Sequence, residues 1–381
     1  MRAAVALLTL GAVAFGFTYS DHAPLIPLVS ADFRLDDLGA GLLSTALFTS
    51  YMTTTVFTTG LAERTGPKRM VGTGLAVSAA GTIIFAVAPG YGVALAAKAI
   101  QGIGAALAFV AGARYLAALY GARRNHFALG LYGAGYPLGS AMALIAMPPL
   151  AAVLGGWRGA FWVEAAIVGA AATLWWRAPS VPPVARPGNI RDALRCPNCW
   201  LAGLQHVAGF GLGISSGTWI TVYLLREFRL PLELSGLLGS LLLILAVLAR
   251  PLGGLLLARE HMPTRRVMRI GDLAIVAGIA LLATPDRPLA IALGGAILVG
   301  IGVGLPYSAV FNTAAASLPA APGAAQGLAA IGGTAGVMVG APAMGYAVQS
   351  FGFWAAWLFV GAVSAFAYIG TSFMRGEEEM R

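Results

Sequence analysis

The feature that most constrains this chain is a series of apolar stretches that are each long enough to cross a lipid bilayer as a helix. About 20 apolar residues span the hydrocarbon core, and tilted helices run longer. Such stretches recur along the whole chain, separated by short polar segments. They predict twelve transmembrane helices, over residues 3–29, 38–61, 70–88, 92–119, 127–153, 160–177, 199–224, 234–257, 267–284, 289–316, 324–349 and 354–374.

The composition leaves little room for any other class of protein. Hydrophobic residues make up 58% of the 381 residues and charged residues only 10%, whereas about 25% is usual in a soluble domain. A soluble fold of this size cannot bury so much apolar surface. A water-soluble enzyme, a secreted disulfide scaffold and a disordered protein are therefore excluded, and the lipid bilayer is the expected partner. Nucleic acid is not an expected partner, because the arginines form no basic stripe interleaved with aromatic residues.

The placement of arginine and lysine predicts the orientation, since cytoplasmic loops of membrane proteins carry an excess of both. With the N-terminus in the cytoplasm, 16 of these residues fall in inner segments and 5 in outer loops, while Lys98, Arg114 and Arg250 lie within spans. This asymmetry predicts that both termini are cytoplasmic. Arginine far outnumbers lysine, which is typical of GC-rich bacterial genomes and predicts a bacterial cytoplasmic (inner) membrane.

The chain divides into two similar halves. A polar, proline-rich stretch splits the spans into six and six, which predicts a bundle over 1–177, a cytoplasmic linker over 178–197 and a second bundle over 198–381. At an offset of 197 residues, Gly135 aligns with Gly332 and Trp157 with Trp354, together with four further matches. Parallel repeats of this kind imply two pseudo-symmetric six-helix bundles with a pathway between them. The expected fold class is therefore an all-α polytopic membrane protein.

The loop after the second span carries a motif. Residues 59–69 read TGLAERTGPKR, and the corresponding segment of the second half, residues 253–259, reads GGLLLAR. The first segment resembles the signature of the major facilitator superfamily, G-x-L-a-D-r-x-G-r-k/r, with Thr59, Glu63 and Pro67 as departures. Residues 98–104, KAIQGIG, are similar to the R-x-x-q-G-x-g of the same superfamily. The resemblance covers essentially the whole chain.

The resemblance implies a gate at this loop, where opposite charges pair in one conformation and separate in the other. The gating residues implied are Gly60, Glu63, Arg64, Gly66, Lys68, Arg69 and Arg259. The alternative is that these charges only set the topology and that the glycines only form a turn. The resemblance also implies that spans 1, 4, 7 and 10 line a central cavity.

Ionisable residues inside the spans are the main functional candidates, because a charge within the membrane normally faces a cavity and a partner. Asp21 and His22 lie about 8 Å outward from the middle of the first span, at 1.5 Å per residue, and Lys98 of the fourth span lies at a similar depth. An ion pair between Asp21 and Lys98 is therefore geometrically possible. Asp21 or His22 is a candidate to bind and release protons. The alternative places both at the outer headgroup boundary, fully hydrated.

Further polar residues fall within spans 4, 7, 8 and 10. The candidates for a substrate or proton pathway are Gln101, Arg114, His206, Arg250, Tyr307 and Asn312, besides Asp21, His22 and Lys98. Arg114 either attracts an anionic substrate or balances Glu63 at the inner gate, and His206 either serves the pathway or forms a structural hydrogen bond. Glycines at 209–217 and Pro306 are expected to bend spans 7 and 10.

Two subfamilies resemble parts of the chain. Residues 250–254, RPLGG, are similar to a segment of nitrate/nitrite porters, whose second substrate arginine comes from span 2; Thr55 occupies that position here, which argues against nitrate itself. Alternatively, Arg250 extends its side chain to the inner membrane face. Drug-efflux relatives carry a G-P-x-x-G motif in span 5, where this chain has Gly135 and Pro137 separated by one residue.

The remaining chemistry-bearing residues are expected to be incidental. Glu164 and Asp272 are read as interfacial, and Cys196 and Cys199 form a bare pair without the further ligands that a zinc site needs. No metal, cofactor or enzymatic activity is expected.

The sequence therefore predicts a secondary active transporter, a monomer that moves a small polar solute by alternating access. Cationic residues outnumber acidic ones among the pathway candidates, which favours an anion, and protons are a candidate coupling ion. The alternatives are a multidrug/proton antiporter and, from another class, a receptor or sensor that does not transport.

Overall fold

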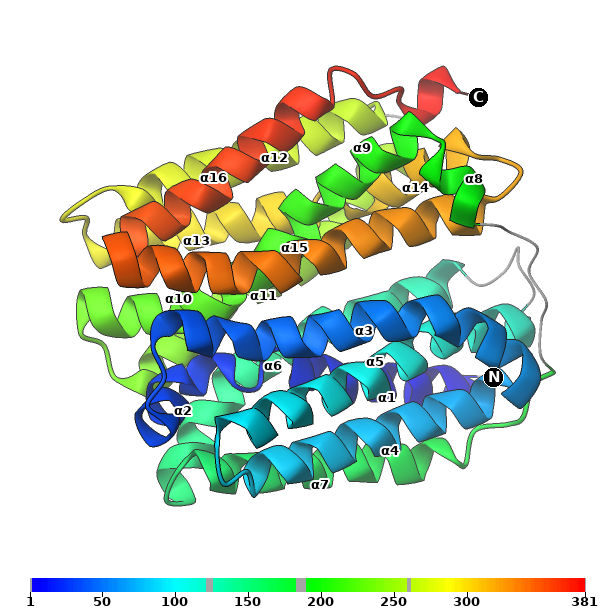
Figure 1. Cartoon of the computed structure of the whole chain (residues 1–381). Helices are drawn as coiled ribbons and strands as arrows, with labels where there is room; N and C mark the ends of the chain where they lie inside the picture. The colour runs from blue at the N-terminus through cyan, green and yellow to red at the C-terminus, as the bar shows by residue number, and fades with distance from the viewer. Residues whose placement is uncertain (1, 121–125, 183–189, 259–261, 381) are drawn as a thin grey trace. The chain divides into compact units, whose positions relative to one another are not determined.

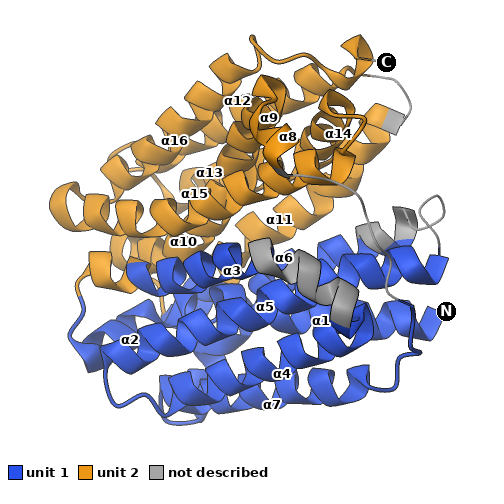
Figure 2. Ribbon diagram, turned by 45° about the vertical axis from the view of Figure 1, so that its right-hand side comes forward, with its two compact units in different colours: residues 1–35, 42–186, 232–236 blue, residues 36–41, 187–231, 237–381 orange. Residues whose placement is uncertain are grey.

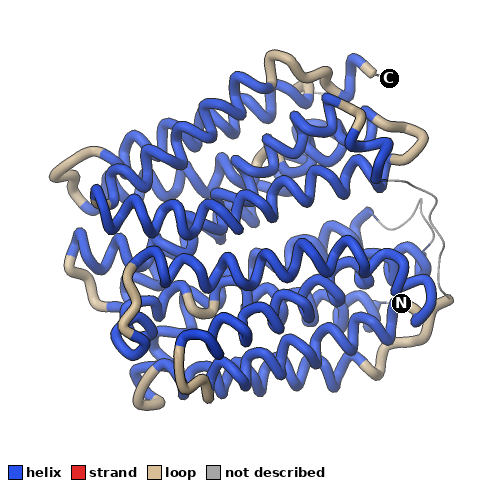
Figure 3. The backbone as a smooth tube through the Cα atoms, in the orientation of Figure 1, coloured by secondary structure: helices blue, strands red, loops and turns tan. Residues whose placement is uncertain are grey.

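The fold was analysed in a computed structural model, and its elements are helices joined by short loops (Figure 1, Figure 3). The structure describes residues 2–120, 126–182, 190–258 and 262–380, and their side chains except at 56–64, 126–127, 129–130, 190 and 258. No strand occurs in these described residues. The all-helical fold class expected from the sequence is confirmed.

The first half of the chain contains the elements α1 (Arg2–Ser20), η1 (Ala23–Leu25), α2 (Ile26–Phe33), α3 (Asp37–Thr65), α4 (Pro67–Ala86), α5 (Tyr91–Tyr120), α6 (His126–Val153) and α7 (Trp157–Trp175). The second half contains α8 (Ile190–Leu194), α9 (Pro197–His206), η2 (Val207–Gly211), α10 (Leu212–Phe228), α11 (Leu232–Ala258), α12 (Thr264–Ala283), α13 (Leu289–Gly304), α14 (Tyr307–Ser317), α15 (Pro322–Phe351), α16 (Phe353–Gly370) and η3 (Glu377–Glu379).

Nine helical stretches of the described chain are long and apolar enough to cross a membrane. The other three predicted spans, over 38–61, 160–177 and 267–284, are helical as α3, α7 and α12 and long enough, but they are less apolar or more charged than the nine. The reason is plain in α12, which carries three arginines and Asp272 in its first nine residues.

The contacts divide the chain into two compact units, coloured separately in Figure 2. Unit 1 comprises residues 1–35, 42–186 and 232–236, and unit 2 comprises residues 36–41, 187–231 and 237–381. The first turn of α3 therefore belongs to unit 2 and the rest of that helix to unit 1. For α11, the first turn belongs to unit 1 and the rest to unit 2.

The same helix pairings occur inside each unit. In unit 1, α4 packs against α5 and α7, and α1 packs against α6. In unit 2, α12 packs against α13 and α16, and α15 packs against α9 and α10. The helices α4 (Pro67–Ala86) and α12 (Thr264–Ala283) are related by the same offset of 197 residues that the sequence matches show. The repeated pairings support a duplicated architecture.

Glycines set the closest helix contacts at equivalent places in the two units. A Cβ atom on Gly104 of α5 would lie 2.5 Å from the carbonyl oxygen of Gly74 on α4. A Cβ atom on Gly302 of α13 would likewise lie 2.5 Å from the carbonyl oxygen of Gly271 on α12. Only glycine permits this approach, which is how membrane helices gain van der Waals contact.

Three spans are interrupted within the membrane-crossing stretch. Pro24 and Pro27 are the second residues of η1 and α2, and because proline lacks an N–H the α-helical hydrogen bonds of span 1 stop at Ser20. Span 7 contains the π-helical turn η2 directly after His206, and span 10 breaks at Pro306 between α13 and α14. The irregularities expected in spans 7 and 10 are therefore present.

Candidate functional site

The break in span 1 places Asp21 and His22 between α1 and η1, and both side chains are fully buried. Asp21 forms an ion pair with Lys98 of α5, whose side chain is also fully buried. The pairing that the depth argument allowed is therefore present. The alternative of a hydrated position at the headgroup boundary is wrong, because the residues of unit 1 enclose both side chains.

The second carboxylate oxygen of Asp21 is bound by a different residue. Gln101, one turn after Lys98 on α5, donates from Nε2 to Asp21 Oδ2 at 3.1 Å and lies 2.9 Å from Thr82 Oγ1 of α4. Residues three apart on a helix share a face, so α5 presents its cation and its amide to the same carboxylate.

His22 links Asp21 to α3. Its Nδ1 lies 3.0 Å from Asp21 Oδ1, and its Nε2 lies 3.0 Å from the hydroxyl of Ser44. A neutral imidazole that donates from Nδ1 to the carboxylate accepts from Ser44 at Nε2. Both ring nitrogens therefore have a partner, and the ring orientation is fixed.

Aromatic rings surround the ammonium group of Lys98. Its Nζ lies 4.9 Å from the ring centroid of Phe85 on α4 and 5.6 Å from that of Phe161 on α7. Cation–π attraction of this kind is stronger when the cation is desolvated. The ammonium is thus held by one carboxylate and by two ring faces.

Glu164 is a member of this cluster that the sequence analysis missed. It lies on α7 one turn after Phe161, is 1% exposed, and interacts electrostatically with Asp21 and Lys98. The expectation that Glu164 is interfacial is wrong. Glu164 is the eighth of the 19 residues of α7, and its position along the span does not tell which face of the helix the side chain occupies. The spacing Phe161–Glu164 on one face was the available signal.

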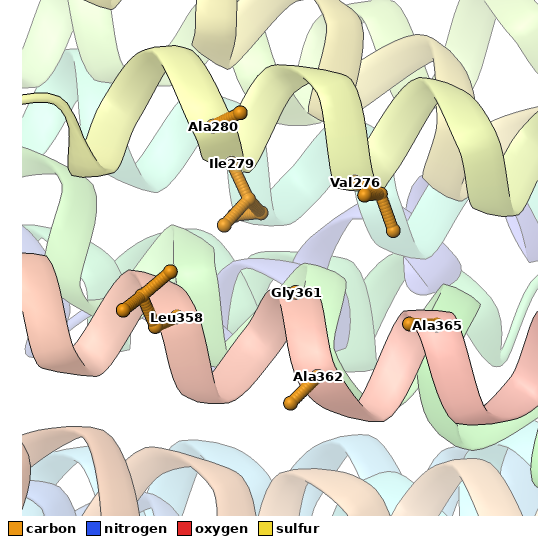
Figure 4. Close-up of a pocket in the computed structure, with 7 residues that line it drawn as sticks. All are labelled: Val276, Ile279, Ala280, Leu358, Gly361, Ala362 and Ala365. Atoms are coloured by element: carbon orange, nitrogen blue, oxygen red, sulfur yellow. The ribbon is translucent and has the colours of Figure 1, made fainter.

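The corresponding place in unit 2 is apolar. At the offsets of 197 and 198 residues, Thr82, Glu164 and Lys98 correspond to Ile279, Gly361 and Ala296. Ile279 and Gly361 line an apolar groove between α12 and α16, in which Ile279 points toward the facing helix (Figure 4). At these positions of the described chain, the acid and the cation of the cluster have no counterpart in unit 2.

Unit 2 brings together three other predicted site residues, His206, Arg250 and Tyr307. The His206 ring stacks on Phe210, with 5.4 Å between centroids, and lies edge-on to Phe311 at 5.0 Å. Tyr307 is 6.1 Å from the same histidine ring. The guanidinium carbon of Arg250 lies 4.3 Å from the Tyr307 ring centroid, and the arginine is buried.

Asp272 also belongs to unit 2, whose helices enclose its side chain. It is buried on α12 and accepts a hydrogen bond from Gln205 Nε2 at 3.0 Å. The same Gln205 nitrogen donates to the carbonyl of Ala367 at 2.7 Å. The prediction that Asp272 lies at the membrane interface is therefore wrong as well.

Two other predicted residues lie apart from these groups. Arg114 is 16 residues beyond Lys98 on the same helix α5, which is about 24 Å at 1.5 Å per residue, and Asn312 on α14 is exposed.

The predicted gate is described only in part. Gly66 adopts a φ of 82°, and Pro67 begins α4 directly after it, so a left-handed glycine makes the turn. Lys68 is half-buried and Arg69 is exposed. The side chains of Glu63 and Arg64 lie outside the described ones, Gly60 lies within α3, and Arg259 lies outside the described residues altogether.

No metal-binding group is found in the described part of the chain, where no three His, Cys, Asp or Glu side chains are placed to hold an ion. Cys196 and Cys199 are both free thiols.

A bundle of apolar helices with buried ionisable groups defines a multi-pass membrane protein. The family model for the Major Facilitator Superfamily matches residues 8–321 and 201–380. The chain belongs to this superfamily, and it is a transporter and not an enzyme.

Similar proteins agree with this assignment. The probable nitrate/nitrite antiporter NarK1 of Thermus thermophilus is 28% identical over 274 residues, which are 63% of this chain and 61% of that protein. A variant of the nucleoside transporter NupG superposes with a TM-score of 0.81 at 15% identity, covering 98% of this chain and 99% of that one. A bacterial homologue of the human lysosomal transporter Spinster, in an inward-facing and occupied conformation, gives 0.76 at 19% identity, with 97% and 95% covered. The two solved structures share the fold.

Proposed function

We propose that this transporter moves a small anion across a bacterial cytoplasmic membrane by alternating access, with proton movement coupled to the anion. The observation that carries the proposal is the buried cluster around Asp21 at the break in span 1. Buried ionisable groups within spans are expensive, and in transporters they commonly form proton relays. We further propose a monomer with both termini in the cytoplasm, as the arginine distribution favours.

The anion preference rests on Arg250. A guanidinium offers several N–H donors in a fixed plane, and stacking on an aromatic ring keeps that plane oriented. Arg250 is stacked in this way on Tyr307, and the aromatic surroundings of His206 continue the same group. The name of the Thermus relative, a nitrate/nitrite antiporter, supports an anion as the substrate class.

The choice of anion is narrowed by Thr55. Its hydroxyl donates to the carbonyl of Tyr51 at 2.8 Å, so span 2 offers a neutral, internally bonded side chain where the resemblance to nitrate/nitrite porters implies an arginine. One arginine instead of two favours a small carboxylate or another anion that needs a single guanidinium. The panel to be tested therefore includes formate, acetate and lactate beside nitrate and nitrite.

Counterflow in proteoliposomes tests the transport mechanism. Vesicles loaded with an unlabelled anion should accumulate the same labelled anion transiently, because alternating access exchanges one molecule for another. An imposed pH gradient should then change the initial uptake rate, and a protonophore should remove that change. Passive equilibration without trans-stimulation would contradict alternating access and favour a non-transporting receptor. Accumulation of lipophilic cations alone would instead favour the multidrug antiporter.

A further inference from the structure

The Asp21 cluster contains two carboxylic acids but only one lysine to balance them. Two carboxylates, Asp21 and Glu164, are buried together with one residue that is cationic at neutral pH, Lys98, and with His22. Ionisation of both acids beside a neutral histidine would leave one uncompensated negative charge in a dry interior. Burial of an unpaired charge is strongly unfavourable, and the usual relief is the uptake of a proton. The cluster is therefore expected to hold one extra proton, on Asp21, on His22 or on Glu164.

Asp21 is the least suitable of the three carriers. Its carboxylate receives the Lys98 ammonium and the His22 ring on Oδ1, and the Gln101 amide on Oδ2. Donors of this kind stabilise the ionised form of a carboxylate. A proton on Asp21 would displace at least one of them.

Glu164 has the opposite environment. Both of its carboxylate oxygens are buried, and neither receives a hydrogen bond from the described residues. Without donors, the ionised form of this side chain loses its hydration and has no hydrogen bond that replaces it. Glu164 therefore gains most from a proton.

His22 is the remaining candidate, and its position argues against it. A protonated imidazole would place a second cation on Asp21 Oδ1, beside the Lys98 ammonium. It would also leave Glu164 ionised and without a donor. Like charges sharing one oxygen repel, whereas a proton on Glu164 leaves one matched ion pair and two neutral groups.

The helices packed against α7 are α1, α4 and α6. The charged residue of α1, Arg2, begins that helix, about 27 Å from Ser20 at 1.5 Å per residue, and Arg158 of α7 itself pairs with Asp32. The charged residues of α4, Lys68 and Arg69, lie in its first turn, about 20 Å from the level of Thr82 at 1.5 Å per residue. The described side chains of α6 include no charged group, and its tyrosines Tyr132 and Tyr136 pack on Phe109 and Tyr19. Asp21, His22 and Lys98 are thus the ionisable groups that face Glu164.

We propose that Glu164 is the residue that takes up and releases the coupled proton, while Asp21 stays ionised and holds Lys98 in place. Release converts the Glu164 carboxylic acid to a carboxylate and passes one proton to water, and uptake is the reverse. Lys98, within electrostatic reach of both acids, is placed to stabilise the carboxylate when it forms. This inference rests on the proton coupling proposed above and names its site.

The test compares three variants in proteoliposomes. Glu164→Gln keeps the shape of the protonated acid but cannot titrate, so pH-gradient-driven uptake should fall to the rate seen without a gradient, while counterflow is retained. His22→Gln should keep most of the gradient response. Glu233→Gln, a matched change at an exposed glutamate in the first turn of α11, should behave as the unmodified protein.

The outcomes separate two kinds of failure. If the unmodified protein shows counterflow but no response to a pH gradient, the proton coupling itself is wrong. If it responds to the gradient and Glu164→Gln responds equally, coupling stands and the assignment to Glu164 is overturned. Loss of the response in His22→Gln but not in Glu164→Gln would also overturn it.

An infrared measurement covers the case in which Glu164→Gln stops all transport. The carbonyl stretching band of a buried, protonated carboxylic acid should be present in the unmodified protein and absent from Glu164→Gln. An identical band in both proteins would overturn the assignment, because the proton would then reside on another group.

Discussion

The two units share their packing and differ in their chemistry. Glycines at 74 and 104 in unit 1, and at 271 and 302 in unit 2, bring equivalent helices into contact. Where unit 1 has Thr82, Lys98 and Glu164, unit 2 has Ile279, Ala296 and Gly361. Unit 2 instead gathers Arg250, Tyr307 and His206 around aromatic rings. Duplication thus kept the residues that fix helix distances, while the polar positions diverged.

The difference suggests a division of tasks between the units. A closed cluster in which acids and bases bind one another suits proton exchange, because a single proton changes its charge. A guanidinium held against a tyrosine ring suits recognition of an anion, because the ring keeps the plane of its N–H donors oriented. The predictions below test this division.

The largest effect is expected from Lys98→Met. Removing one partner of a buried ion pair leaves the other charge uncompensated, at a cost of about 3–5 kcal/mol. The unfolding temperature of the purified protein should drop sharply, and the double variant Asp21→Asn with Lys98→Met should recover most of the loss. Arg158→Met, which breaks the half-exposed pair with Asp32, is the control and should change little. Equal losses of unfolding temperature in Lys98→Met and Arg158→Met would contradict the account of the cluster.

The next largest effect concerns unit 2. Arg250→Met should weaken anion binding by about 10–100-fold, because a charge-assisted hydrogen bond contributes about 1.5–3 kcal/mol. The thermal shift produced by the transported anion measures this change. The response of uptake to a pH gradient should persist at saturating anion. An unchanged affinity would remove Arg250 from the substrate site and break the proposed division.

A third prediction concerns what the units share. Gly104→Ala in unit 1 and Gly302→Ala in unit 2 each push a methyl group against a backbone carbonyl of the neighbouring helix. Overpacking of this kind costs about 1–3 kcal/mol, and both variants should lower the unfolding temperature by similar amounts. A large difference between the two would show that the packing of the repeats is not equivalent.

The smallest effect is expected at the outer charge pair of unit 1. Asp32 pairs with Arg158, and both side chains are about 40% exposed. Exposed pairs contribute about 0–1 kcal/mol, so Asp32→Asn should change the unfolding temperature by a degree or two at most. A larger change, measured in the same detergent, would mean that the hydrogen bond from the Trp157 indole to Asp32 matters more than the charge.

The sequence predicted much of the fold, because helix length and hydropathy depend on the bilayer and not on tertiary detail. The break at Pro306 and the irregular turn after His206 followed from local residue types. Asp21 and Lys98 could be matched, since two charges at one depth in a dry medium have few other partners.

Helix rotation is what the sequence could not supply. Glu164 and Asp272 were assigned to the interface from their distance along a span, whereas packing turns both inward. Nothing in the residues next to Asp272 identifies Gln205, 67 positions away, as its donor. Contacts between distant helices depend on how the helices pack, and a single sequence does not reveal them.

The most direct test of the central claim is proton flux measured with a pH-sensitive dye inside vesicles while an anion gradient drives transport. Coupling is reciprocal, so an anion gradient must move protons if a proton gradient moves anions. The account predicts a pH change inside vesicles that contain the unmodified protein and none with Glu164→Gln. Anion movement without any pH change in the unmodified protein would contradict it.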